Sequence, residues 1–156
     1  KLIKGIFSIG LTLGLIGIAI YIDARYIEPK LLWEKEETLQ TSKLSHTTKL
    51  KVVLFSDVHL GESYSLSDFD KVIDKINALK PDMILFAGDL IDDYKEFEAD
   101  DKVGLLLQKL KAPYGKYTIY GNHDHGGYGT ERYAKIMKTA GFTLLRNQNA
   151  TIELAD

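Results

Sequence analysis

Cysteine is absent from this chain of 156 residues, which excludes disulfide bonds and thiolate metal sites and is compatible with any compartment. Clustered positive charge is lacking as well: the 20 Lys and Arg residues are scattered, the net charge is −2 and the pI is about 6.1. We therefore expect no nucleic-acid partner. No G-x-x-x-x-G-K-S/T sequence occurs, so the glycines do not form a phosphate-binding P-loop.

Hydrophobic residues make up 45% of the chain, which is enough for the core of one globular domain. Runs of aliphatic, β-branched and aromatic residues predict three strands, at Leu50–Phe55, Met83–Ala87 and Lys116–Tyr120. Two shorter strands are predicted near Phe142–Leu145 and Ala150–Leu154.

Amphipathic helices are predicted in the gaps between these strands. Ser67 is the expected N-cap of the first helix, and the second begins within Glu96–Asp101. The third is capped by Thr130 and closed by Gly141. Strands that alternate with helices predict the α/β class with a parallel sheet.

Three polar strings stand where predicted strands end: Asp57-Val58-His59, Gly88-Asp89-Leu90-Ile91-Asp92 and Gly121-Asn122-His123-Asp124. Sites form at this edge of an open α/β sheet. Oxygen and imidazole ligands without cysteine favour a hydrolytic metal centre over a structural zinc. The chemistry indicated is water activated between two cations beside a phosphate ester.

These strings, in this order, resemble the opening motifs of the calcineurin-like metallophosphoesterase family: D-x-H, G-D-x-x-D and G-N-H-D/E. The resemblance extends from about Lys49 to Leu154 and implies the βαβαβ half of a metallophosphoesterase sandwich. It also implies two divalent metal ions (Mn, Fe or Zn). The implied metal ligands are Asp57, His59, the bridging Asp89 and Asn122, and the implied catalytic acid pair is His123 with Asp92.

The second half of the family pattern, a further histidine and then G-H-x-H, is missing, because no histidine follows His125. We therefore expect a fragment of a longer protein, with little activity by itself, and the lack of an initiating Met points the same way. The alternative is a truncated product with an incomplete site. His125 itself is interpreted as a loop residue, with contact to substrate or a ligand role as alternatives.

The N-terminal segment is predicted to be a membrane anchor. Gly5 to Ile22 gives 18 uncharged residues, which span ~27 Å as a helix. A signal peptide is the rival, but the stretch is longer than a usual apolar region and no cleavage site follows it. We predict an anchor at 1–22, a linker at 23–48 and a domain at 49–156. His46, in the linker, is interpreted as a loop residue.

Orientation is not decided by the positive-inside rule, because basic residues flank both ends of the span. An uncleaved anchor with basic residues ahead of it favours a single-pass cell-membrane protein with its domain outside the cytoplasm. We therefore predict a membrane-anchored phosphoesterase or phosphodiesterase whose substrate is lipid-linked. The alternative is a non-catalytic membrane protein that keeps half of a phosphoesterase scaffold as a binding module.

Overall fold

The computed structural model describes residues 2–42 and 49–154. The chain divides into two compact units, Lys1–Glu36 and Glu37–Asp156. In the first unit, helix α1 (Leu2–Ile22) is followed by a turn of π-helix (Asp23–Ile27) and a turn of 3₁₀-helix (Glu28–Lys30). The helical span Ile3–Lys30 is long and apolar enough to cross a membrane by length and composition. The first part of the predicted linker is thus helical, and its residues 43–48, including His46, lie outside the described residues.

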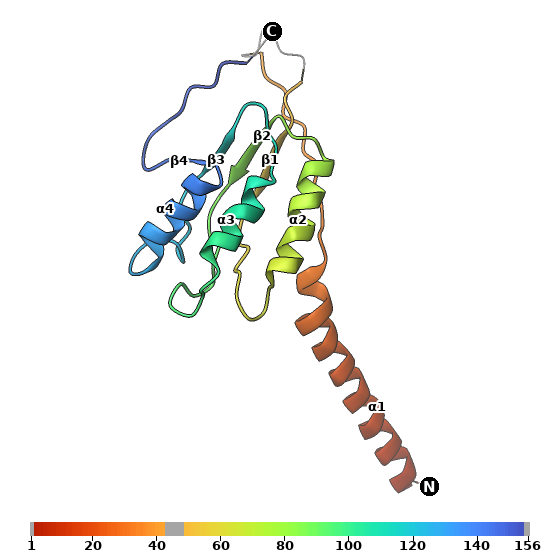
Figure 1. Ribbon diagram of the computed structural model, residues 1–156. Helices are drawn as coiled ribbons and strands as arrows, with labels where there is room; N and C mark the ends of the chain where they lie inside the picture. Colours follow the sequence, from red (N-terminus) through yellow and green to blue (C-terminus); the bar gives the residue numbers. More distant parts are fainter. Residues whose placement is uncertain (1, 43–48, 155–156) are drawn as a thin grey trace. The chain divides into compact units, whose positions relative to one another are not determined.

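The second unit is a four-stranded parallel sheet in the order β1-β2-β3-β4, with one helix between each pair of successive strands (Figure 1). Its elements are β1 (Val52–Phe55), α2 (Leu66–Ala78), β2 (Met83–Phe86), α3 (Asp100–Gln108), β3 (Lys116–Thr118), α4 (Gly129–Thr139) and β4 (Thr143–Leu144). The predicted α/β class with a parallel sheet is confirmed.

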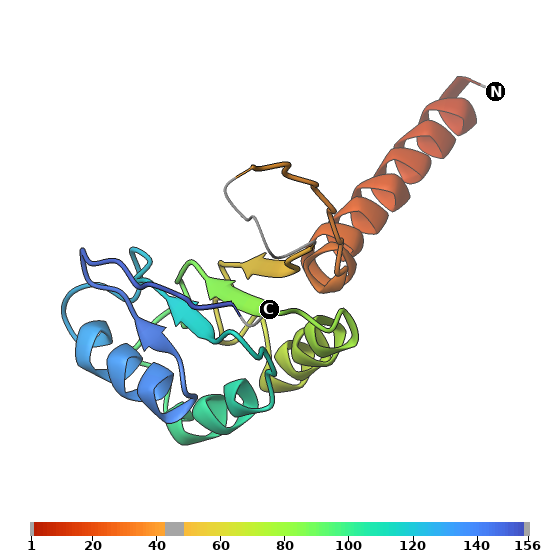
Figure 2. The ribbon, with the colours of Figure 1, turned by 90° about the horizontal axis from the view of Figure 1, so that it is seen from above.

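The sheet carries its helices on one face. Figure 2 shows α2, α3 and α4 together on the same side of the strands. Phe55 pairs in register with Phe86, and Phe86 with Thr118, so these side chains point to the helices. Neighbouring positions on β1, such as Leu54, point to the other face because side chains alternate along a strand.

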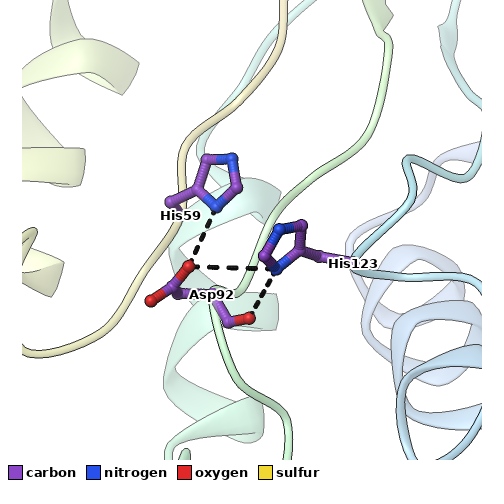
Figure 3. Close-up of side chains that lie close together, drawn as sticks. All are labelled: His59, Asp92 and His123. Atoms are coloured by element: carbon purple, nitrogen blue, oxygen red, sulfur yellow. Dashed lines mark hydrogen bonds and ion pairs between the residues drawn. The ribbon is translucent and has the colours of Figure 1, made fainter.

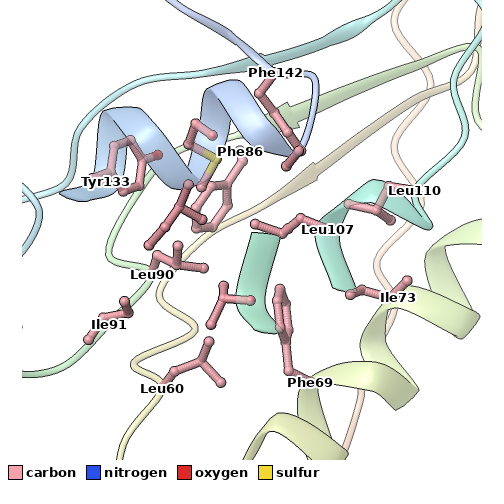
Figure 4. Packing of buried hydrophobic residues seen from close by; sticks show 14 of the residues in the cluster. Leu60, Phe69, Ile73, Phe86, Leu90, Ile91, Leu107, Leu110, Tyr133 and Phe142 are labelled. Carbon is pink, nitrogen blue, oxygen red and sulfur yellow. The ribbon is translucent and has the colours of Figure 1, made fainter. Parts of the chain in front are cut away.

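The core lies between the sheet and the three helices (Figure 4). Each helix contributes residues at helical spacing, such as Phe69, Ile73 and Ile76 of α2. Phe55 and Phe86 stack with their ring centroids 4.6 Å apart. This packing fixes the carboxyl ends of the strands, from which the site loops leave.

Two predicted helix caps were wrong. Ser65, and not Ser67, caps α2: its hydroxyl accepts the Asp68 N–H at 3.2 Å and donates to the Asp68 carboxylate at 2.7 Å. This reciprocal pair of hydrogen bonds fixes the N-cap of α2 two residues before the predicted one.

The start of α4 also differs from the prediction. Thr130 lies inside the first turn of α4, where its hydroxyl accepts the Gly126 N–H. The predicted closure of α4 by Gly141 is confirmed, since Gly141 has a φ of 77° and donates to Lys138.

The predicted strand at Ala150–Leu154 is also wrong, because these residues form no ladder with the described strands. Asn147, with a φ of 51°, turns the chain just after β4.

Candidate active site

The three polar strings meet at the carboxyl edge of the sheet. After β1 and β2 the chain segments continue side by side: the Asp57 N–H donates to the Gly88 carbonyl at 3.0 Å and the His59 N–H to the Asp89 carbonyl at 3.1 Å. The third loop lies against the second, because Gly88 and Gly121 touch through their backbones. A Cβ at Gly88 would lie 2.0 Å from the Gly121 nitrogen, so only glycine fits there.

Three of the predicted ligands have left-handed backbone conformations. The φ angles are 56° at Asp57, 48° at His59 and 58° at Asp89. Such conformations are uncommon for residues other than glycine and concentrate at functional sites. Here all three residues lie in the segments that follow β1 and β2.

Asp57, His59 and Asp89 form a first group of ligand atoms, all within 4.8 Å of one another. The Nε2 atom of His59 lies 3.8 Å from Oδ1 of Asp57. Asp89 is only 8% exposed and its Oδ1 accepts the His123 N–H at 2.7 Å, so its position is fixed by the third loop. Carboxylate and imidazole donors of this kind fit a divalent Mn, Fe or Zn ion.

His59, Asp92 and His123 form a second group within the same limit (Figure 3). Oδ1 of Asp92 lies 3.2 Å from Nδ1 of His59 and 3.8 Å from Nδ1 of His123. Nδ1 of His123 has a closer partner, the backbone carbonyl of Asp92, at 2.6 Å. Asp92 thus contacts both imidazoles, one mainly through its carboxylate and the other mainly through its carbonyl.

The pKa of His123 is raised, mainly by the hydrogen bond to the Asp92 backbone carbonyl and further by the charges of Asp89, Asp92 and Asp124; partial burial opposes the shift. A carbonyl only accepts, so Nδ1 of His123 carries a proton. The other ring nitrogen, Nε2, then takes or gives the proton that changes the charge.

Asn122 is exposed and lies between Gly121 and His123 on the third loop. The structure therefore brings Asp57, His59, Asp89, Asp92 and His123 together and places Asn122 on the same loop. The neighbouring His125 is also exposed, and its ring stands at 84° to the ring of Tyr120 with centroids 5.8 Å apart.

Asp124 has a part in the site that the sequence reasoning missed. Its carboxylate is completely buried and accepts four hydrogen bonds: from the Asp89 N–H at 2.6 Å, the Leu90 N–H at 3.1 Å, the Gly121 N–H at 3.0 Å and the Tyr94 hydroxyl at 2.7 Å. It holds the second and third loops together. Its place as the last residue of the G-N-H-D string was the available signal.

Tyr94 was missed too. Burial, together with the Asp124 carboxylate, raises the pKa of its hydroxyl, which therefore stays protonated and donates. Arg132 of α4 fixes the segment around Tyr94, because its guanidinium donates to the carbonyls of Tyr94 and Phe97 and pairs with Asp100.

Comparison with known proteins matches residues 50–152 to the family model for calcineurin-like phosphoesterases. The uncharacterized metallophosphoesterase YkuE of Bacillus subtilis is 43% identical over 100% of this chain and 55% of its own length. The UDP-2,3-diacylglucosamine pyrophosphatase LpxG of Chlamydia muridarum is 34% identical over 71% of this chain and 34% of its own. The chain thus spans about half or less of the length of these relatives.

Among solved structures, the chain is similar to the nuclease MPE of Pseudomonas putida, with a TM-score of 0.39 and 18% identity over 60% of this chain and 46% of that one.

Proposed function

This chain belongs to the calcineurin-like phosphoesterase family, and from that premise we propose that it forms the metal-binding half of a membrane-anchored enzyme that hydrolyses phosphate esters at a dinuclear site. The observation that carries the proposal is the meeting of oxygen and imidazole ligands from three loops that are far apart in the sequence.

Asp57 and His59 would hold the first metal ion, Asp89 would bridge the two ions and Asn122 would bind the second. The first three have ligand atoms within 4.8 Å of one another. Bound divalent ions supply an activated water and stabilise charge on the phosphate oxygens. The oxygen of Asp89 that accepts the His123 N–H retains a second lone pair, and its other oxygen is available as well, so bridging and positioning are compatible.

His123 would act as the general acid. Its Nδ1 is held by the Asp92 carbonyl, so Nε2 is the nitrogen that gives its proton to the leaving oxygen as the ester bond breaks. The raised pKa favours the protonated form needed for this step. Asp92 would also orient His59 through its carboxylate, as carboxylates commonly do for metal-bound imidazoles.

A lipid-linked substrate is the proposed class. The first unit holds a helix long and apolar enough to anchor the chain at a membrane. LpxG, by its name, acts on a diacylated sugar nucleotide at a pyrophosphate bond. An enzyme anchored beside the bilayer would meet such substrates where they lie.

The test uses the protein from the complete reading frame that contains this chain. We expect it to hydrolyse bis(p-nitrophenyl) phosphate with Mn²⁺, to lose that turnover to a chelator and to regain it when Mn²⁺ returns. Turnover that survives exhaustive chelation would overturn the metal mechanism. Tight metal binding without hydrolysis of any phosphate ester would favour the non-catalytic binding module instead.

The anchor is tested separately, by membrane flotation of the complete protein and of a form that begins at Glu37. We expect the complete protein to float with membranes and the shortened form to stay in the soluble fraction. Protease digestion of intact cells then reports the orientation, and digestion of the domain from outside is the expected result.

A further inference from the structure

The ring of Tyr120 provides a fixed platform beside the proposed metal site. Tyr120 follows β3 and immediately precedes the Gly121-Asn122-His123 string. Its ring packs against the core ring of Tyr133, with centroids 5.1 Å apart, and its hydroxyl donates to the Thr130 carbonyl at 3.5 Å. Since consecutive Cα atoms are ~3.8 Å apart, the Cα atoms of Tyr120 and Asn122 lie within about 8 Å of each other.

Arg146 lies over this platform. The Leu145 N–H donates to the Thr118 carbonyl at 2.8 Å, which extends the pairing of β4 with β3 and brings Arg146 beside Tyr120. The Cζ atom of the Arg146 guanidinium is 5.1 Å from the centre of the Tyr120 ring. The side chain is exposed, and no carboxylate of the described residues lies within ion-pair distance of it.

This arrangement is suited to anion binding. A guanidinium stacked on an aromatic ring keeps its N–H edges free, and these edges match the oxygens of phosphate or carboxylate. His125 adds an exposed ring N–H near the same platform, at 5.8 Å between the His125 and Tyr120 centroids. Its backbone N–H donates to the Gly121 carbonyl at 3.2 Å, which ties it to the loop of the metal site.

We propose that Arg146 and His125, both placed at the Tyr120 ring, form a subsite for a second phosphate group of the substrate, so that diesters of pyrophosphate are preferred over esters of a single phosphate. The proposal rests on the proposed function, because it assigns the first phosphate to the metal site. Asp57, Asp89 and Asp92 make that site acidic, so the subsite supplies positive charge for an anion that lies beyond the metal ions.

The first experiment compares two substrates that differ by one phosphate: the p-nitrophenyl esters of uridine monophosphate and of uridine diphosphate. In the complete protein, Arg146→Gln should lower kcat/KM for the diphosphate ester by about tenfold or more, mainly through KM, since a charge-assisted hydrogen bond is lost. The value for the monophosphate ester should change by less than about twofold. His125→Ala should act in the same direction with a smaller effect.

Lys138→Gln is the matched control, because it removes one positive charge from an exposed position near the end of α4. It should leave both substrates unchanged. Arg146→Lys, which keeps the charge but loses the planar fork, should restore part of the preference. Equal losses on the two esters, or no loss on either, would overturn the subsite while the hydrolytic function stands.

A measurement of pyrophosphate binding tests the subsite independently of hydrolysis, so it shows whether the subsite or the proposed function has failed. Calorimetric titration of the metal-free complete protein with inorganic pyrophosphate should show binding that Arg146→Gln weakens and Lys138→Gln does not. This result supports the subsite even if no ester is hydrolysed. Absence of pyrophosphate binding to the wild-type protein, or equal affinity in Arg146→Gln, would overturn the subsite.

Discussion

At the residue scale, substitutions at Asp89 and His123 test metal binding and proton transfer separately. Asp89→Asn keeps an oxygen that accepts the His123 N–H but removes the charge shared by the two metals, so metal affinity and turnover should both collapse. His123→Ala should keep the metals and slow the chemical step by ~10²–10⁴-fold. Metal content and single-turnover rates check both variants.

Asp74→Ala is the control for Asp89→Asn and His123→Ala, because Asp74 is an exposed carboxylate of α2 outside the site. Its loss should leave the metal content and the single-turnover rate unchanged. Loss of metal in His123→Ala together with full metal content in Asp89→Asn would reverse the proposed roles.

The raised pKa of His123 gives a second prediction at this scale. Its main cause is the Asp92 backbone carbonyl, so in metal-free Asp92→Asn protein the pKa should fall only partly and stay above the usual ~6.5. Because the folded state binds this proton more tightly, the stabilisation is complete below pH ~6.5 and is lost as pH rises through the folded-state pKa. NMR titration of the imidazole measures the shift, and a return to the ordinary value would assign the shift to the carboxylate instead.

At the scale of elements, Asp124 joins the loops after β2 and β3. Asp124→Ala leaves three backbone N–H groups without their acceptor, and each such loss costs ~1–3 kcal/mol when the donor is buried. Tyr94→Phe removes only one hydrogen bond, which is worth ~1.5–3 kcal/mol because its acceptor is a charged carboxylate. In urea denaturation of the metal-free protein, the free energy of unfolding should therefore be much lower for Asp124→Ala than for Tyr94→Phe. Equal losses would show that the backbone donors find other partners.

Also at the scale of elements, most strands and helices could be predicted from the sequence, whereas some contacts between elements could not. The strands and helices follow from local hydrophobic periodicity, and the ligand strings were found because they directly follow strands. Asp124 was overlooked because three of its four hydrogen-bond donors come from residues that are 30 to 35 positions away in the sequence. The start of α2 was misplaced because Ser65 and Ser67 are both good caps, and the reciprocal bond with Asp68 decides between them.

At the scale of the whole molecule, the sheet face opposite the helices carries exposed apolar side chains. Leu54 is 67% exposed, and Val52 and Ile119 are also exposed. Leu54 pairs in register with Leu85, and Leu85 with Tyr117, so the apolar surface continues across three strands. Exposed apolar patches of this kind mark contact surfaces.

We propose that residues outside this chain cover that face in the complete protein, because the chain spans only 55% of the length of YkuE. Leu54→Lys should then destabilise the complete protein by ~1.5–3 kcal/mol, the transfer cost of a buried leucine. In the 156-residue form the same change should leave the stability nearly unaltered and reduce self-association. Leu105→Lys, at a 60% exposed position on α3, is the control and should affect the stability of neither form. Denaturation measures the stability of the complete protein and of the 156-residue form, and sedimentation measures their self-association. An equal effect of Leu54→Lys on the stability of the two forms would show that the face stays open to solvent.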